Sequence, residues 1–315
     1  MNYSTLFGPV PSRRLGISLG IDLVPYKTCS LNCIYCEVGK TTNLTTKREE
    51  YVSKEKIIFE LDDFFKSNPE LDYITFSGQG EPTLNSKIGE IIDYIKSNYP
   101  RYKLALLTNG TLFYKKKLIK EVLKCDLILP SLDSATKIGF KKINQPAEDL
   151  ILPNILRGLV DLRKNYKGNI WLEIFVVPGI NDSKEELKSL KKYIKKIDPE
   201  QIQLNSLDRP GLESWIRKAT LNEMEKIKKY LSEFNVKIIA NFQKRKKVKS
   251  YNENIENRIL SMTKRRPCTK EDMLNTFDIN VNELNKYLGY LEENNLIKKH
   301  RADRGIFYKS TKNSK

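Results

Sequence analysis

The chain has 315 residues, of which 30% are charged, and a formal net charge of +17. Its length allows one large domain or two ordinary ones, and the lack of a run of about 18 apolar residues excludes a membrane-spanning helix. The N-terminus lacks the charged start and apolar stretch of a signal peptide, and the five cysteines, odd in number and mostly clustered, exclude a secreted disulfide framework. We therefore expect a cytoplasmic protein with no membrane partner.

Six apolar runs in the first two thirds of the chain predict β-strands. They span residues 15–24, 71–77, 103–108, 126–132, 170–177 and 201–206. Each leads toward a segment with helical periodicity, such as 56–65 and 88–95. Near-continuous hydrophobicity within the strands favours a parallel sheet covered by helices. The alternation is typical of an incomplete β/α barrel or of an open doubly wound sheet, and periodicity does not choose between them.

Two of the helices between these strands have clear start signals. Ser183 with Glu186 and Thr220 with Glu223 have the spacing of a capping box, in which each side chain bonds the backbone of the other residue. Both helices are therefore expected to begin directly after the serine or threonine.

Beyond residue 241 the sequence changes character. The stretch QKRKKVKSYNEN, residues 243–254, has no apolar periodicity and is interpreted as a basic linker. The elements predicted after it are a helix from Ile255 to Met262, a helix capped by Thr269 with Asp272, a helix from Val281 to Asn294, and two short strands around Gly305. Three helices followed by a hairpin is the outline of a winged helix-turn-helix domain. We therefore expect two domains, residues 1–244 and residues 245–315.

The positive charge is concentrated near the end of the chain. Residues 236–315 carry 19 Lys and Arg against 9 Asp and Glu, whereas the remainder carries 37 against 30. Such a field favours polyanionic partners, nucleic acid above all. The alternative is that the lysines only solvate helix faces.

Three of the five cysteines lie within eight residues and are spaced C-x3-C-x2-C, at Cys29, Cys33 and Cys36. A structural zinc site needs four ligands, usually as two close pairs, and the other candidates are distant in the sequence: Cys125, Cys268 and His300. Iron–sulfur clusters normally take four thiolates, so a [4Fe-4S] cluster held by three leaves one iron open to a non-protein ligand. The spacing therefore favours an iron–sulfur cluster over zinc.

This segment resembles the cluster motif of the radical S-adenosylmethionine (SAM) enzymes, C-x3-C-x-aromatic-C, with Tyr35 in the aromatic position. The resemblance implies that the amino and carboxylate groups of SAM chelate the open iron of a [4Fe-4S] cluster. An electron from the reduced cluster then cleaves SAM to methionine and a 5′-deoxyadenosyl radical, which abstracts hydrogen from a substrate. The resemblance also implies a low-potential electron donor such as ferredoxin or flavodoxin. For the fold, it implies a partial (β/α)6 TIM-like barrel over residues 15–210 of this α/β chain.

Strings at the predicted strand ends resemble further SAM-binding segments of that family. SGQGEPTL, residues 77–84, is similar to its Gly-Gly-Glu-Pro segment, which implies that Gly78, Gly80 and Glu81 hold the methionine amino group. Gln79 departs from the pattern and leaves open which glycine makes the contact. The resemblance places the other SAM contacts at Asn109, Ser131, Asp133 and Val177. Each of these also suits an ordinary polar turn, but their order after a matching cysteine motif argues against coincidence.

The strings GEPTL, LTNGT, SLDSA and KKINQP place the resemblance in the branch that contains the tRNA wyosine-forming enzymes. Those enzymes carry a second cluster on upstream cysteines, and residues 1–28 contain none. Candidate substrate residues are Glu173, Asn205 and Arg209, and Asp208, Arg13 and Arg14 are further candidates. Glu173 interrupts an apolar strand, so its carboxylate must find a partner.

Three hypotheses remain open from the sequence. The first is a radical SAM enzyme that modifies RNA, tRNA in particular, with the basic C-terminal domain contacting phosphates. The second is a radical SAM enzyme for a small metabolite or a peptide. The third is an iron–sulfur DNA-binding sensor, which would have no need of SAM-like strand ends.

Overall fold

The computed structural model describes residues 3–12, 14–208, 211–239, 255–277, 279 and 281–311. The predicted linker at 243–254, and with it the predicted domain boundary, lies outside these residues. None of the helices within them is long and apolar enough to cross a membrane.

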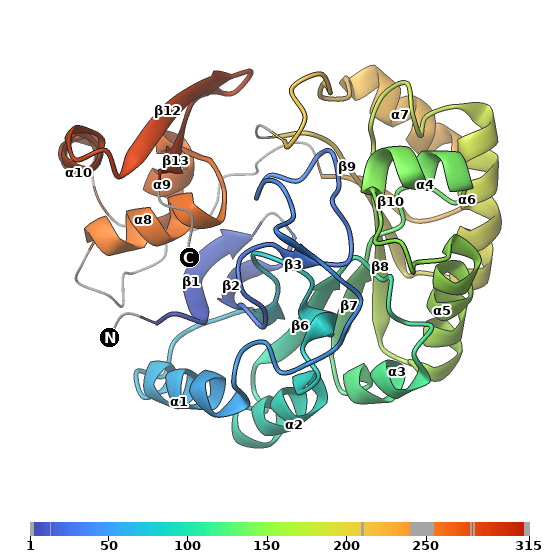
Figure 1. Ribbon diagram of the computed structural model, residues 1–315, viewed down its shortest axis with the longest axis horizontal. Helices are drawn as coiled ribbons and strands as arrows, with labels where there is room; N and C mark the ends of the chain where they lie inside the picture. Colours follow the sequence, from blue (N-terminus) through green and yellow to red (C-terminus); the bar gives the residue numbers. More distant parts are fainter. Residues whose placement is uncertain are drawn as a thin grey trace.

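An eight-stranded sheet forms the centre of the molecule (Figure 1). Its strands, in spatial order, are β1 (Leu6–Ser12), β2 (Gly16–Ile21), β5 (Tyr73–Phe76), β6 (Lys103–Thr108), β7 (Leu127–Pro130), β8 (Asn169–Phe175), β9 (Gln201–Asn205) and β10 (Val236–Ile238). Only the pair of β1 with β2 is antiparallel. The mostly parallel α/β architecture is consistent with a partial β/α barrel.

All six predicted strands are present in this sheet, whereas β1 and β10 were not predicted. The sequence of β1, LFGPVPS, contains a glycine and two prolines, which interrupt a strand pattern. Proline is tolerated there because β1 is an edge strand. β10 has only three residues, too few for a periodicity to be recognised.

Helices cover one face of the sheet (Figure 1). They are α1 (Lys54–Phe65), α2 (Ile88–Asn98), α3 (Lys116–Val122), α4 (Lys137–Asn144), α5 (Leu152–Asn165), α6 (Lys184–Ile197) and α7 (Leu221–Tyr230), with a 3-10 turn η1 at Pro82–Leu84. Strand residues such as Leu104, Leu172 and Leu204 join these helices in the main hydrophobic core. Because successive strand residues alternate in direction, their neighbours face the opposite, inner side of the sheet.

One of the two predicted capping boxes forms completely. Thr220 and Glu223 cap α7 reciprocally. Ser183 accepts a hydrogen bond from the amide of Glu186 at 3.2 Å, as expected. The carboxylate of Glu186, however, accepts from Ser134 and Thr136 instead, so the second half of that prediction is wrong. The tertiary contact ties α6 to the loop after β7.

The C-terminal segment, here the described residues between 255 and 311, has its own hydrophobic cluster, which includes Ile259, Leu288 and Tyr308. Its elements are α8 (Ile255–Arg265), β11 (Cys268–Thr269), α9 (Lys270–Thr276), α10 (Val281–Glu293), β12 (Ile297–Ala302) and β13 (Gly305–Ser310). The strands form an antiparallel sheet in the order β11-β13-β12.

Buried ion pairs join this segment to the main sheet. Arg265 on α8 binds Asp22, which follows β2, at 2.8 Å. Arg304, in the turn between β12 and β13, binds Asp208, which follows β9. Both carboxylates lie at the carboxyl ends of parallel strands, an edge that we call the mouth. The C-terminal segment therefore contacts the mouth at two widely separated strands, on the left of the view in Figure 1.

Candidate active site

The three clustered cysteines lie on a loop that leaves β2 at the mouth. Two short parallel strands, β3 (Thr28–Cys29) and β4 (Asn43–Leu44), close the loop at its base. The amide of Cys36 donates to the carbonyl of Cys33 at 3.0 Å, which keeps the last two cysteines on one turn. All three thiols are partly buried and free of disulfides. The loop thus presents three thiols from a compact stretch of backbone.

Each of the three sulfur atoms receives an N–H donor from the surrounding chain. The ammonium of Lys27 lies 3.1 Å from the sulfur of Cys36, and the side-chain amide of Asn144 lies 3.4 Å from that of Cys33. The sulfur of Cys29 accepts from the backbone of Leu31 at 3.5 Å and from Asn109 at 3.6 Å. Hydrogen bonds of this kind stabilise metal-bound thiolates and tune the potential of an iron–sulfur cluster.

Burial also changes the acidity of two of these thiols. Burial raises the pKa of Cys29 to about 11, and it raises the pKa of Cys33 as well. Both are neutral near pH 7 unless a metal ionises them. Within the described residues no three His, Cys, Asp or Glu side chains are placed to hold a single metal ion. A cubane cluster binds each thiolate through a separate iron atom, so its three thiolates need not converge on a single metal ion.

The segment between β5 and η1 packs directly against the cysteine loop. A Cβ atom at Gly78, where φ is +126°, would meet the carboxylate of Asp22 at 1.7 Å, and one at Gly80 would meet the carbonyl of Thr28 at 2.2 Å. The amide of Glu81 donates to the same carbonyl of Thr28 at 3.0 Å. Both glycines are therefore required by close approach to neighbouring groups.

Glu81 anchors this segment to β6. Its buried carboxylate accepts from the hydroxyl of Thr108 at 2.6 Å, from the amide of Asn109 at 2.7 Å and from the amide of Thr83 at 3.0 Å. Burial raises its pKa, and these hydrogen bonds oppose that rise. The predicted SAM contacts at Gly78, Gly80 and Glu81 stay predictions, and the structure adds a local structural role for each.

Asp133, which follows β7, is the centre of a buried network beside the cysteine loop. Its carboxylate accepts from the hydroxyl of Tyr35 at 2.7 Å, the side-chain amide of Asn144 at 2.7 Å and the backbone of Phe175 at 2.9 Å. The rings of Tyr35 and Phe175 stack with centroids 3.8 Å apart. Because Asn144 also reaches the sulfur of Cys33, this network links Asp133, a predicted SAM residue, to the cysteine loop.

The other predicted SAM residues also lie at the mouth. Asn109 donates to the hydroxyl of Ser30, next to Cys29, at 2.9 Å. Ser131 follows β7 and pairs with Glu173 across an isolated bridge. The backbone N–H of Val177 donates to the side chain of Asn181 at 2.8 Å, so that amide is already occupied within its own turn. Their contacts with SAM remain predictions.

The predicted substrate residues lie on the inner face of β8 and β9. Glu173 forms an ion pair with Arg14, which supplies the partner that its burial requires. Asn205 is buried at the end of β9, and its side-chain oxygen accepts from the amide of Ser206 at 3.0 Å. Arg209 lies outside the described residues. Beside Glu173 in the register, Gln203 is buried and its side-chain oxygen has no hydrogen-bond partner among the described residues.

Lys27, Asn144 and Gln203 were not predicted as site residues. Lys27 stands two positions before Cys29, and a lysine so close to a metal motif was a usable signal. Asn144 belongs to the string KKINQP but lies 111 residues from its sulfur partner, so only the fold brings them together. Gln203 lies in QIQLN, where polar and apolar residues alternate, and this alternation was a signal for polar side chains on the inner face.

Comparison with known proteins agrees with this geometry. Residues 23–190, more than half of the chain, match the Radical SAM superfamily. The chain is 32% identical to a UPF0026 protein of Methanocaldococcus jannaschii over 312 residues, which are 96% of this chain and 94% of that protein. It is 43% identical over 225 residues, 71% of this chain, to a protein of Brachyspira hyodysenteriae named GTPase Obg, of which it spans only 33%.

More distant likenesses extend to RNA-modifying enzymes and to solved structures. A probable dual-specificity RNA methyltransferase RlmN of Chlorobium phaeobacteroides is 29% identical over 177 residues, 52% of this chain and 47% of that protein. A radical SAM methyltransferase from Sphaerobacter thermophilus superposes with a TM-score of 0.56 at 13% identity, covering 70% of this chain and 66% of its own. TYW1 with a lysine–pyruvate adduct superposes with a TM-score of 0.51 at 20% identity, covering 73% and 76%.

Enzymes of this kind bind a [4Fe-4S] cluster and SAM, and the cysteine loop fits such a cluster because it supplies three partly buried thiols with a hydrogen-bond donor at each sulfur. Both the sequence match and the mostly parallel fold lead to one conclusion, that the chain belongs to the radical SAM superfamily.

Proposed function

We propose that the protein uses the 5′-deoxyadenosyl radical to abstract hydrogen from a nucleotide of RNA, with tRNA as the leading candidate. The predicted winged-helix domain, residues 245–315, would hold the RNA against the mouth. A low-potential reductant such as ferredoxin or flavodoxin would supply the electron.

The chain's own residues have distinct parts in this proposal. Cys29, Cys33 and Cys36 would hold the cluster, and the N–H groups around them would stabilise its negative charge. When bound, the cluster and SAM supply reductive cleavage of a sulfonium bond. The buried pair of Tyr35 with Asp133 would keep the SAM side of the loop in place and exclude water from the reacting atoms.

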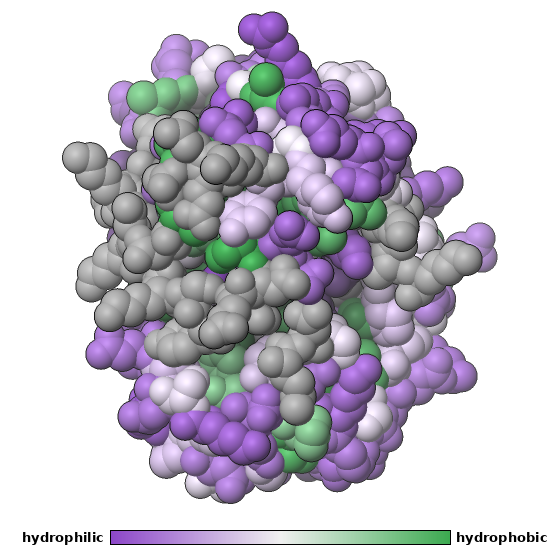
Figure 2. All heavy atoms as spheres, turned by 90° about the vertical axis from the view of Figure 1, so that its left-hand side faces the viewer, coloured by the Kyte–Doolittle hydropathy of each residue, from purple (hydrophilic) through white to green (hydrophobic). Residues whose placement is uncertain are grey.

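The observation that carries the RNA assignment is a row of exposed basic residues on β12. Lys298, Lys299, His300 and Arg301 are all exposed, and β12 is an edge strand. The adjoining turn reaches the mouth, where Arg304 binds Asp208. Seen from this side, the coloured residues in Figure 2 are mostly hydrophilic. A cationic strand next to a radical site is suited to the phosphates of an RNA, and the likeness to an RNA methyltransferase supports the same substrate class.

Charge neutralisation tests the assignment. Lys298→Gln with Arg301→Gln removes two charges from β12, and Lys184→Gln with Lys188→Gln removes two exposed charges from α6 as the matched control. We expect the β12 variant to bind tRNA about tenfold more weakly in a fluorescence anisotropy titration. The dependence of its affinity on salt concentration should also be shallower, by the equivalent of roughly two phosphate contacts. Equal affinities for the two variants would contradict the assignment.

Product analysis tests the reaction itself. The anaerobically reconstituted protein would be incubated with SAM, a reductant and cellular RNA, followed by mass spectrometry of the nucleosides. A new modified nucleoside that depends on Cys33 is expected. SAM cleavage that leaves every nucleoside unchanged, but alters a small metabolite in the same extract, would favour the metabolite hypothesis instead.

A further inference from the structure

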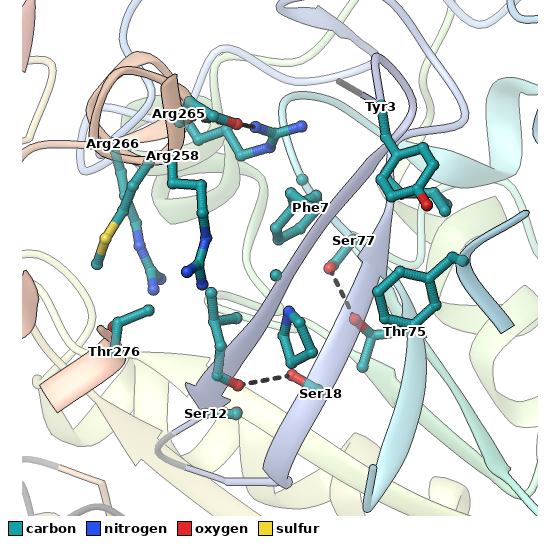
Figure 3. Close-up of a pocket in the computed structure, with 18 of the residues that line it drawn as sticks. Tyr3, Phe7, Ser12, Ser18, Thr75, Ser77, Arg258, Arg265, Arg266 and Thr276 are labelled. Carbon is teal, nitrogen blue, oxygen red and sulfur yellow. Dashed lines mark hydrogen bonds between the residues drawn. The ribbon is translucent and has the colours of Figure 1, made fainter. Parts of the chain in front are cut away.

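A cavity of about 610 Å³ lies between the main sheet and the C-terminal segment (Figure 3). One wall consists of β1, β2 and β5, and it carries the hydroxyl groups of Ser18, Thr75 and Ser77. The facing wall is α8, with Arg258 and Arg265, together with Arg266 directly after it. The volume falls within the roughly 300–1,000 Å³ range of sites for small molecules. It admits a single nucleotide and not a double helix.

Cationic side chains outnumber anionic ones around this cavity. Among the described residues the lining includes Arg14, Lys66, Arg258, Arg265 and Arg266, against Glu37 and Asp63. Arg14, Arg265 and Lys66 form ion pairs with Glu173, Asp22 and Asp63. Three of the five cations, Arg258, Arg265 and Arg266, lie on the side formed by α8 and the residue after it.

Arg258 on α8 and Arg266 directly after it extend toward β1 across the cavity, as Figure 3 shows. The guanidinium of Arg258 lies 4.7 Å from the ring centroid of Phe277, a contact that orients it. Burial lowers the pKa of Arg258 to about 10, so it stays charged at neutral pH. Two oriented guanidinium groups opposite a row of hydroxyls match the oxygens of a phosphate.

The same cavity reaches the candidate active site. Glu37 and Val38, which directly follow Cys36, line it, and so does Gly78 of the segment after β5. A ligand held by α8 would therefore extend toward the cysteine loop. This position distinguishes the cavity from a surface patch, because its contents would be adjacent to the radical chemistry.

We propose that this cavity binds the phosphate group of the substrate nucleotide through Arg258 and Arg266. The sugar and base would extend along the inner wall toward the cysteine loop. In taking the ligand to be a nucleotide of RNA, the proposal rests on the function proposed above. Because a cavity of this volume suits one nucleotide, that nucleotide would have to leave its stack, as in other enzymes that act on single bases.

Calorimetric titration of the reconstituted holoprotein with uridine 5′-monophosphate, uridine and inorganic phosphate tests the site. Uridine is chosen because it lacks the adenine that SAM carries. We expect the monophosphate to bind at least about tenfold more tightly than uridine, because only the phosphate can accept charge-assisted hydrogen bonds from both arginines. Inorganic phosphate should compete with the monophosphate.

Variants identify the groups responsible. Arg258→Met with Arg266→Met should weaken binding of the monophosphate about tenfold or more and leave uridine unchanged, whereas Arg258→Lys with Arg266→Lys should lose less. Lys264→Met, an exposed cation on the same helix outside the cavity lining, is the control and should bind like the native protein. A double methionine variant that has the same unfolding temperature as the native protein and still binds the monophosphate normally would overturn the proposal.

Binding of a short single-stranded RNA distinguishes the two sources of the phosphate, a nucleotide within RNA and a free nucleotide. If the double methionine substitution weakens the binding of both the monophosphate and the RNA, the cavity binds a nucleotide of RNA. If it affects the monophosphate while no RNA binds, the phosphate site stands and the RNA function fails. If RNA is modified with unchanged KM in the arginine variant, the phosphate site is refuted and the RNA function stands.

Discussion

Lys27 is the most unusual single residue of the cysteine loop. It is 3% exposed, its backbone has a φ of 51°, and its ammonium donates to the sulfur of Cys36. A buried ammonium requires a charged partner, and a cluster-bound thiolate would provide one. Lys27 therefore acts as a fixed positive charge beside the predicted cluster.

Lys27→Met should make the reduction potential of the cluster more negative. An added electron is stabilised by a nearby cation, and methionine fills similar space without the charge. The potential would be measured by an electron paramagnetic resonance titration of the reconstituted protein. Lys40→Met removes an exposed charge from the same loop and should leave the potential near the native value. An equal or higher potential in Lys27→Met would show that the ammonium does not tune the cluster.

Asp133 should make stability depend on pH. Burial raises its pKa from 3.8 to about 6, so the folded protein retains a proton in this range that the unfolded chain releases. The contribution of Asp133 to the free energy of unfolding is then largest below about pH 4 and falls, by up to about 3 kcal/mol, as the pH rises to about 6.

Urea unfolding of the cluster-free protein at several pH values checks this prediction. The free energy of unfolding of the native protein minus that of Asp133→Asn should decrease between pH 4 and pH 6, because only the native protein has the carboxyl of Asp133, which titrates there. A difference that is flat or increases with pH would exclude the raised pKa.

At the scale of elements, the segment after β5 fixes the position of the cysteine loop. A Cβ atom at Gly80 would overlap the carbonyl of Thr28, the residue before Cys29. Gly80→Ala should therefore displace the loop, destabilise the fold by about 1–3 kcal/mol and lower the iron and sulfide content per chain. Both contents are measured after reconstitution.

Gly289→Ala is the matched control, because no atom lies within 4 Å of the added Cβ. It stands inside α10, where alanine favours the helix, so the free energy of unfolding should rise by roughly 0.5–1 kcal/mol with unchanged iron content. Full iron content in Gly80→Ala would contradict the positioning role.

The elements also show what the sequence could reveal. Hydrophobic runs located β2 and β5 to β8 because buried parallel strands are largely apolar, and the apolar residues that alternate with polar ones in QIQLN still revealed β9. The edge strand β1 was not predicted, because its edge position permits prolines, and prolines in a sequence normally indicate the end of a strand. Cysteine spacing pointed to the cluster, whereas Asn144 could not be assigned, because its contact with Cys33 depends on how α4 packs against the loop.

At the scale of the whole molecule, two buried ion pairs hold the C-terminal segment at the mouth. The double variant Arg265→Met with Arg304→Met should release this segment, since Asp22 and Asp208 each lose a guanidinium partner. We expect faster cleavage between the two parts in limited proteolysis, SAM cleavage near the native rate and slower turnover of RNA.

A compensated variant separates pairing from simple damage. Asp22→Asn combined with Arg265→Met removes both charges, so it should resist proteolysis better than Arg265→Met alone. Native resistance in the double arginine variant would mean that other contacts hold the segment.

Asp22 serves two neighbours at once. The carboxylate that receives Arg265 also accepts from the backbone amide of Gln79, one residue after Gly78, at 3.1 Å. If α8 moves away, the carboxylate of Asp22 loses Arg265 and must be solvated by water or paired with another cation. The turn at Gln79, which donates to the same carboxylate, would then be affected as well. The position of the C-terminal segment and the shape of the turn that carries Gly78 therefore depend on the same carboxylate.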